Sequence, residues 1–229
     1  MQTLVVIAMQ AEADPVIEAL GLHGAGAQLH PAFPARLWVD ERVAVATNGT
    51  DPRFGVDSIA TQPAVTTTLH AVERLRPALV VSAGTAGGFA ARGGGIGSVY
   101  LADRCVFHDR RVAVAGFDRY GDGDYPVADL GRIADGLGFE RGTVSTGNAL
   151  DAPLPDIEKM RASGAVAKDM EAAAVAWTCE RLGVPFTALK VVTDLVDSAE
   201  ETAEQFQRNL QTATATLAGA VASLVAALE

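Results

Sequence analysis

The stretch that decides the fold is VVSAGTAGGF, residues 80–89. Its first half is a continuous apolar run, which is typical of a strand covered by helices on both faces; strands of an open antiparallel sheet alternate instead. Its second half is a glycine-rich turn with the hydroxyl of Thr85 at its centre. Ligand crevices in layered α/β sheets lie at the carboxyl ends of strands, where glycine allows close approach to the backbone. A turn that needs glycine for its geometry alone is the alternative.

Outward from this stretch, short β-branched runs alternate with longer helical patterns. We predict strands at Leu4–Ala8, Val43–Thr47, Leu79–Ser82, Val99–Ala102, Thr143–Ser145 and Phe186–Val192, and helices at Ala11–Leu20, Ser58–Leu75, Val127–Leu137, Glu171–Leu182 and Thr202–Leu228. The last helix is expected to open with a capping box of Thr202 and Gln205. This alternation predicts a three-layer α/β fold with a central mixed β-sheet flanked by helices.

The 229 residues contain no internal repeat. The stretches Arg92–Gly97 and Gly116–Pro126 look like loops, but neither is long or polar enough to link two domains. We therefore expect a single domain, residues 1–229. The chain begins without a basic leader, and the apolar positions of its uncharged C-terminal stretch Asn209–Leu228 fall at helical spacing between polar residues. We predict an amphipathic helix covering the core there, and no membrane partner.

The net charge and the number and spacing of the cysteines exclude several classes of function. The net charge is −10 and no basic stripe is present, so nucleic acid is not an expected partner. Cys105 and Cys179 lie far apart, which suggests neither a disulfide framework nor a zinc cluster, and a cytoplasmic location fits. The four histidines are isolated in sequence and the common serine-hydrolase, zinc-protease, P-loop and dinucleotide motifs are missing. We expect no metal and no cofactor.

Three acids stand at predicted strand or helix ends. Glu12 follows the first strand, Asp194 follows the last one, and Glu171 begins a helix of small residues. Burial and mutual repulsion push the pKa values of such carboxyls apart, so that one can act as a base while another holds a proton for donation. Met170 beside Glu171 would suit a sugar, which presents an apolar ring face and hydroxyls. Helix capping and dipole roles are the structural alternatives for these acids.

Five stretches in this order carry a family resemblance: AMQAE at residues 8–12, SAGTAGG at 82–88, VSTG at 144–147, DMEA at 169–172 and VTD at 192–194. They resemble the signatures of the 5'-methylthioadenosine/S-adenosylhomocysteine nucleosidases, within the purine nucleoside phosphorylase superfamily. The stretches VFHDRR at 106–111, GFDRYG at 116–121, LKVVTDLVD at 189–197 and TAEQF at 202–206 are similar to the plant-type branch. The resemblance covers essentially the whole chain and implies a nucleoside phosphorylase/hydrolase-like fold.

The resemblance implies hydrolysis of the N-glycosidic bond of a 5'-thioadenosine to adenine and a 5-thioribose. In that reading Asp194 protonates the purine, Glu12 activates water, and Glu171 binds the ribose hydroxyls. The other implied substrate-site residues are Met9 and Met170 against the sugar, Thr85 near the water or ribose, Leu150 and the Asp151 backbone at the adenine, Lys190 where it could pair with Glu12, and Gly87, Lys168 and Phe206. The chemistry demands such a set, because bond breaking builds positive charge on the ribose.

The resemblance also implies a homodimer in which the neighbouring subunit closes the 5' pocket, through Phe107, Phe117 or other residues of the His108–Tyr120 region. The alternative is that these aromatic side chains fill the core of their own subunit. Three positions depart from the family pattern. One is Lys190, which replaces the arginine usual in the bacterial branch, although the plant-type branch also carries lysine. Asn148 stands where an aspartate is usual, and Ala203 occupies a position that is aromatic in the bacterial branch. The substrate therefore stays open among methylthioadenosine, S-adenosylhomocysteine and 5'-deoxyadenosine.

Three other functions remain as alternatives. A phosphorylase would need arginines for its phosphate, and the stretches Ile7–Glu12 and Gly84–Phe89 contain none. An aminodeoxyfutalosine nucleosidase would use the same three carboxylates. A non-catalytic nucleoside-binding protein would be expected to lack Glu12 or Asp194, and both are present.

Overall fold

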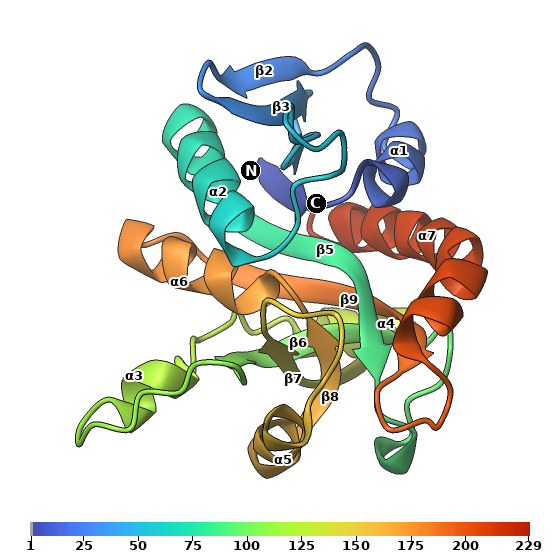
Figure 1. Ribbon diagram of the computed structural model, residues 1–229. Coiled ribbons are helices and arrows are strands. Elements are labelled where there is room, and N and C mark those ends of the chain that lie inside the picture. Colours follow the sequence, from blue (N-terminus) through green and yellow to red (C-terminus); the bar gives the residue numbers. More distant parts are fainter. Residues whose placement is uncertain (1) are drawn as a thin grey trace.

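The computed structural model describes residues 2–229 (Figure 1). In this part of the chain nine strands form a mixed sheet of order β2-β3-β4-β1-β5-β8-β7-β6-β9, and β5 also pairs with β9. The strands are β1 (Thr3–Ile7), β2 (Ala27–His30), β3 (Phe33–Val39), β4 (Val43–Thr47), β5 (Leu79–Gly88), β6 (Val99–Phe107), β7 (Glu140–Thr146), β8 (Ala165–Asp169) and β9 (Phe186–Leu195). Because β5 pairs with both β8 and β9, the strands from β5 to β9 close into a ring.

Helices cover both faces of this sheet. They are α1 (Gln10–Ala19), α2 (Thr61–Leu75), α3 (Asp118–Asp122), α4 (Gly131–Leu137), α5 (Leu154–Ser163), α6 (Ala172–Leu182) and α7 (Thr202–Ala227), with a 3₁₀ turn η1 at Ala90–Arg92. Figure 1 shows α2 and α6 together on one side of β5, and α1 and α7 on the other. The predicted three-layer fold, a mixed sheet flanked by helices, is confirmed.

The continuous apolar pattern of the strands follows from this double cover. In β1, Leu4 and Val6 belong to the core beneath α2 and α6, whereas Val5 and Ile7 belong to the core beneath α1 and α7. All four side chains are buried. Neither face of the strand meets water, so no polar residue is needed at alternate positions.

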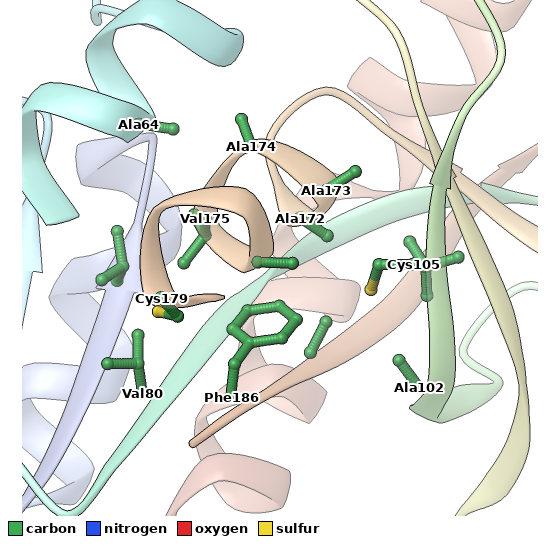
Figure 2. Close-up of a cluster of buried hydrophobic side chains, with 14 of the residues drawn as sticks. Ala64, Val80, Ala102, Cys105, Ala172, Ala173, Ala174, Val175, Cys179 and Phe186 are labelled. Carbon is green, nitrogen blue, oxygen red and sulfur yellow. The ribbon is translucent and has the colours of Figure 1, made fainter. Parts of the chain in front are cut away.

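Small side chains let α6 approach the sheet closely. Ala172, Ala173, Ala174 and Val175 are buried in one cluster with Phe186, and Figure 2 shows the first turn of α6 lying over the Phe186 ring, with Val175 on the side of that ring and Ala174 on the opposite side of the helix. This packing fixes the first turn of α6, the helix that directly follows Glu171. The position of that carboxylate is therefore set by the core itself.

The C-terminal helix α7 is long and apolar enough to cross a membrane by length and composition. In the structure it packs on α1 and β9, and Leu217, Val221 and Leu224 are fully buried in the core. These three residues belong to the apolar stripe predicted from the sequence, whereas Phe206, Leu210 and Leu228 at the two ends of that stripe are half-buried.

Several local predictions differ from the structure. The glycine-rich stretch after Ser82 is not a turn, because β5 continues to Gly88 and pairs with β9 along its length. The capping box at Thr202 is wrong: the N-cap is Glu201, and the amide of Gln205 instead accepts the Leu195 N–H and donates to the Glu200 carbonyl. A short helix, α3, lies inside the predicted loop 116–126. The sequence patterns also missed β2, β3, β8 and α5.

Candidate active site

The carboxyl ends of β1, β5, β8 and β9 surround a cavity of about 370 Å³. Parallel pairing of β5 with both β1 and β9 brings the ends of these three strands to the same edge of the sheet, and antiparallel pairing of Gly87 with Lys168 adds the end of β8. Ten of the twelve sequence-predicted site residues line the cavity: Met9, Glu12, Thr85, Gly87, Leu150, Lys168, Met170, Glu171, Asp194 and Phe206. Lys190 and Asp151 do not.

Glu12 lies in the first turn of α1 and is almost fully buried, with 4% of its surface exposed. Its Oε1 accepts two hydrogen bonds from Thr85, one from the backbone N–H at 2.8 Å and one from the hydroxyl at 2.6 Å. Burial raises the pKa of Glu12, while the Thr85 hydrogen bonds and nearby Lys190 act in the opposite direction. With Oε1 occupied by Thr85, the carboxylate is held in one orientation and Oε2 is left for a ligand or water.

Asp194 stands near the end of β9, opposite Gly87 of β5 in the strand register. It is 3% exposed, and its Oδ1 accepts the Thr193 hydroxyl at 2.8 Å. Burial raises the pKa of this carboxyl, which favours its protonated form. A Cβ at Gly87 would lie 2.7 Å from Asp194 Oδ2, so glycine is the residue that leaves room for the acid.

Lys190 lies behind the cavity, not in its wall. The resemblance placed Lys190 where it could pair with Glu12, but in the structure Lys190 Nζ pairs with Asp169 Oδ2 at 2.9 Å, with both side chains buried. Asp169 also accepts hydrogen bonds from the Thr146 hydroxyl and the Ala172 N–H. Lys190 therefore forms its ion pair with Asp169, and no ion pair joins it to Glu12 within the described residues. Lys190 still lowers the pKa of Glu12 through the charge it carries nearby.

Glu171 is the N-cap residue of α6 and faces the cavity. Its Oε1 accepts the backbone N–H of Ala60 at 2.8 Å. Burial, followed by the charge of Asp169, raises the pKa of Glu171 to about 7. Met9 and Met170 line the same cavity. Glu171 thus presents an acceptor beside two apolar methionine side chains, an arrangement that suits the hydroxyls and the ring face of a ribose.

Lys168 organises the loop that follows β7. It is buried, and its ammonium donates to the carbonyls of Ala149 and Leu150, each at 2.8 Å. These bonds hold Leu150 over the cavity mouth, where its side chain is 43% exposed. Asp151 is exposed and lies outside the lining. The loop therefore contributes Leu150 to the site, and the prediction for Asp151 is not supported.

Other lining residues were missed by the sequence patterns. The segment before α2 contributes Val56, Asp57 and Ile59, and Asp57 accepts the Gln10 N–H at 2.9 Å. Asp169 forms part of the floor. No local motif marks residues 56–59, but Asp169 adjoins a predicted site residue in the DMEA stretch and could have been found as the partner of the buried lysine.

The described residues also bear on metal and anion binding. Within residues 2–229, no group of three histidine, cysteine, aspartate or glutamate side chains is arranged to hold a metal ion. None of the described residues that line the cavity is an arginine. His108 is buried beside the Ser145 hydroxyl, and His30 stacks on His70. The cavity thus offers carboxylates and two methionines, with Lys168 engaged by backbone carbonyls.

Comparison with known proteins shows the family to which the chain belongs. Residues 2–226 match the family model of the phosphorylase superfamily. The 5'-methylthioadenosine nucleosidase of Arabidopsis thaliana is 39% identical over 96% of this chain and 84% of its own length, and a 5'-methylthioadenosine/S-adenosylhomocysteine nucleosidase of the same plant is 36% identical over 93% and 85%. The apo structure of the Arabidopsis thaliana 5'-methylthioadenosine nucleosidase superposes with a TM-score of 0.96 at 38% identity, covering 100% of this chain and 96% of the other.

The fold and the strand-end cavity are those of a nucleoside-cleaving protein of the phosphorylase superfamily. Within that superfamily, the chain belongs to the family of the 5'-methylthioadenosine nucleosidases.

Proposed function

We propose that this protein is an N-glycosyl hydrolase that cleaves 5'-methylthioadenosine into adenine and a 5-thioribose. The observation that carries the proposal is the convergence of Glu12, Glu171 and Asp194 on one cavity, in a chain that belongs to the nucleosidase family. S-adenosylhomocysteine and 5'-deoxyadenosine share the adenine and the ribose and are further candidate substrates.

Asp194 acts as the general acid in this proposal. Its raised pKa keeps the carboxyl protonated at higher pH than an exposed aspartate. With Oδ1 bonded by the Thr193 hydroxyl, Oδ2 is the oxygen that faces Gly87 and can donate a proton to a purine ring nitrogen. Protonation lets the electron pair of the breaking C–N bond settle on a neutral adenine.

Glu12 acts as the general base. Thr85 fixes its carboxylate through Oε1, so Oε2 can accept a proton from water. The water oxygen bonds to the anomeric carbon of the ribose as the bond to adenine breaks. Positive charge that develops on the sugar ring is stabilised by the carboxylates on this side of the cavity.

Glu171 binds the ribose hydroxyls. An ionised carboxylate offers about four acceptor positions. One is used by the Ala60 N–H, which leaves acceptors for two neighbouring hydroxyls. Met9 and Met170 supply an apolar surface for the sugar, and Phe206 lies where it can contact the substrate.

Water is the proposed nucleophile because the described cavity has no arginine to bind phosphate. The experiment measures adenine release from 5'-methylthioadenosine, S-adenosylhomocysteine, 5'-deoxyadenosine and aminodeoxyfutalosine, with and without phosphate. Release without phosphate, fastest from methylthioadenosine, is the expected result. Release that requires phosphate would show a phosphorylase, release from the futalosine alone would move the substrate class, and no release would show a binding protein.

We also infer that the protein is a homodimer whose partner subunit closes the 5' pocket. Val114, Phe117 and Tyr120 are 56%, 47% and 57% exposed, an apolar group that a partner would cover. Phe107 cannot take this part, because it is 1% exposed and packs edge-on against Tyr125 in its own subunit. Light scattering of the wild-type protein and of Phe117→Asp tests the inference; a monomeric wild type overturns it.

A further inference from the structure

The backbone of Ala60 is strained. Its φ of 76° and ψ of −172° lie in a region that is essentially restricted to glycine, yet an alanine occupies it at the start of α2. Such conformations persist only where surrounding contacts hold them, and they concentrate at functional sites. The contacts that hold the Ala60 conformation involve Glu171, which lines the cavity.

The strained peptide aims its N–H at Glu171. The bond from the Ala60 nitrogen to Glu171 Oε1 is 2.8 Å long and joins segments that are 111 residues apart in the sequence. A helical conformation at residue 60 would direct this N–H elsewhere. The strain therefore provides a backbone donor on one side of the carboxylate.

The next residue is fixed by a second set of bonds. The Thr61 N–H and hydroxyl both donate to Asn148 Oδ1, at 3.2 and 2.7 Å. The backbone N–H and the side-chain amide of Asn148 in turn donate to Asp109 Oδ2, at 2.7 and 3.0 Å. Because Asp109 accepts a hydrogen bond from the side-chain amide nitrogen of Asn148, the amide oxygen of Asn148 must face Thr61.

We propose that Asp109, Asn148 and Thr61 hold the strained Ala60 peptide so that its N–H fixes the Glu171 carboxylate for the ribose hydroxyls. This inference rests on the proposed function and adds Asn148 and Asp109 to it as positioning residues. It also gives a physical role to Asn148, which stands where the resemblance led us to expect an aspartate. An aspartate there would place a second carboxylate against Asp109.

The Ala60 bond acts on Glu171 in two ways. It fixes the rotation of the carboxylate, so that the remaining lone pairs face the cavity. It also favours the ionised form, because an N–H donor stabilises the negative charge. Both effects raise affinity for hydroxyl donors, and neither touches the adenine.

The test compares wild type, Asn148→Asp, and the exchange variant Asp109→Asn/Asn148→Asp. Asn148→Asp keeps the acceptor for Thr61 but places two carboxylates at the 3.0 Å contact. The exchange variant restores one amide and one carboxylate there. Gln62→Ala, an exposed change in the same turn of α2, is the matched control.

We expect Asn148→Asp to raise KM for 5'-methylthioadenosine about tenfold, as loss of a charge-assisted contact does. The inhibition constant of adenine, which has no ribose, should stay within about twofold, and the exchange variant should recover most of the KM effect. Equal losses for adenine and nucleoside, or no recovery in the exchange variant, would overturn the proposal.

A second measurement does not depend on turnover. Amide hydrogen exchange of residues 58–62 is followed in wild type and in Glu171→Ala. Loss of the acceptor should speed exchange of the Ala60 N–H about tenfold or more, because its protection comes from that bond. Unchanged exchange would overturn the inference. A wild type that releases no adenine would contradict the proposed function, while this measurement still decides the role of Ala60.

Discussion

Lys190 and Asp169 form a buried ion pair directly behind the proposed active site, with Nζ and Oδ2 2.9 Å apart. The charge of Lys190, together with hydrogen bonds from Thr146 and Ala172, keeps the pKa of Asp169 low despite its burial. Burial raises the pKa of both Glu12 and Glu171, and the charge of the same lysine partly offsets that rise. One buried cation thus balances three carboxylates, and its loss should affect both stability and catalysis.

Lys190→Met should be strongly destabilising, because it leaves Asp169 buried without its counter-ion. Breaking a buried pair in this way costs about 3–5 kcal/mol. Urea unfolding measures the change. Arg42→Met, which removes an exposed pair with Glu229, is the control and should cost less than about 1 kcal/mol. Equal effects of the two variants would show that burial of the lysine pair does not matter.

Asp194→Asn should abolish hydrolysis without unfolding the protein. The amide is nearly isosteric but cannot deliver a proton, and removing a general acid lowers the rate about 10²–10⁴-fold. Adenine release is the measurement, and thermal unfolding shows that the fold is intact. Turnover close to wild type in a folded variant would exclude Asp194 as the acid.

Thr85→Val and Thr85→Ser separate the hydroxyl of Thr85 from its shape. The hydroxyl donates to Glu12 Oε1 at 2.6 Å and lowers the pKa of that group. Without it the pKa rises, so Glu12 stays protonated, and inactive as a base, to higher pH. We expect the acidic limb of the kcat/KM profile to move to higher pH in Thr85→Val and to stay in place in Thr85→Ser. A shift in both variants, or in neither, would show that the Thr85 hydroxyl does not control the pKa of Glu12.

The sequence predicted the elements whose signal is local. Residues 3–7 and 43–47 are apolar at every position but the terminal threonines because helices cover both faces, and this pattern is visible without a structure. By contrast, β2 has only four residues, and β8, although as long as β1, has the sequence AVAKD, which ends in two charged residues. Those residues are buried by partners from distant segments, and no local pattern records such pairing.

In the candidate active site, too, residues with a local sequence signal were predicted and contacts between distant segments were not. Glu12 and Asp194 were singled out because they are acids near the ends of predicted strands, but structural roles were an alternative for both, and their proposed catalytic roles came from the family resemblance. Glu12 was named as a residue with which Lys190 could pair, and only the geometry shows that Asp169 makes the contact. The Ala60 donor has no sequence signal at all, because a backbone N–H belongs to every residue except proline.

Gly87→Ala tests whether the cavity needs glycine on β5. The added Cβ would lie 2.7 Å from both Asp194 Oδ2 and Val196 Cγ2, distances that force the acid to move. Overpacking of this kind costs about 1–3 kcal/mol. Misplacement of a catalytic group by about 1 Å lowers activity roughly 10²-fold, so kcat should fall far more than stability explains.

Gly219→Ala on α7, where a Cβ meets nothing within 4 Å, is the matched control. It should leave kcat unchanged and stabilise the helix by about 1 kcal/mol. Thermal unfolding and adenine release on both variants give the comparison, and full activity in Gly87→Ala would mean that Asp194 does not occupy the position that its proposed role requires.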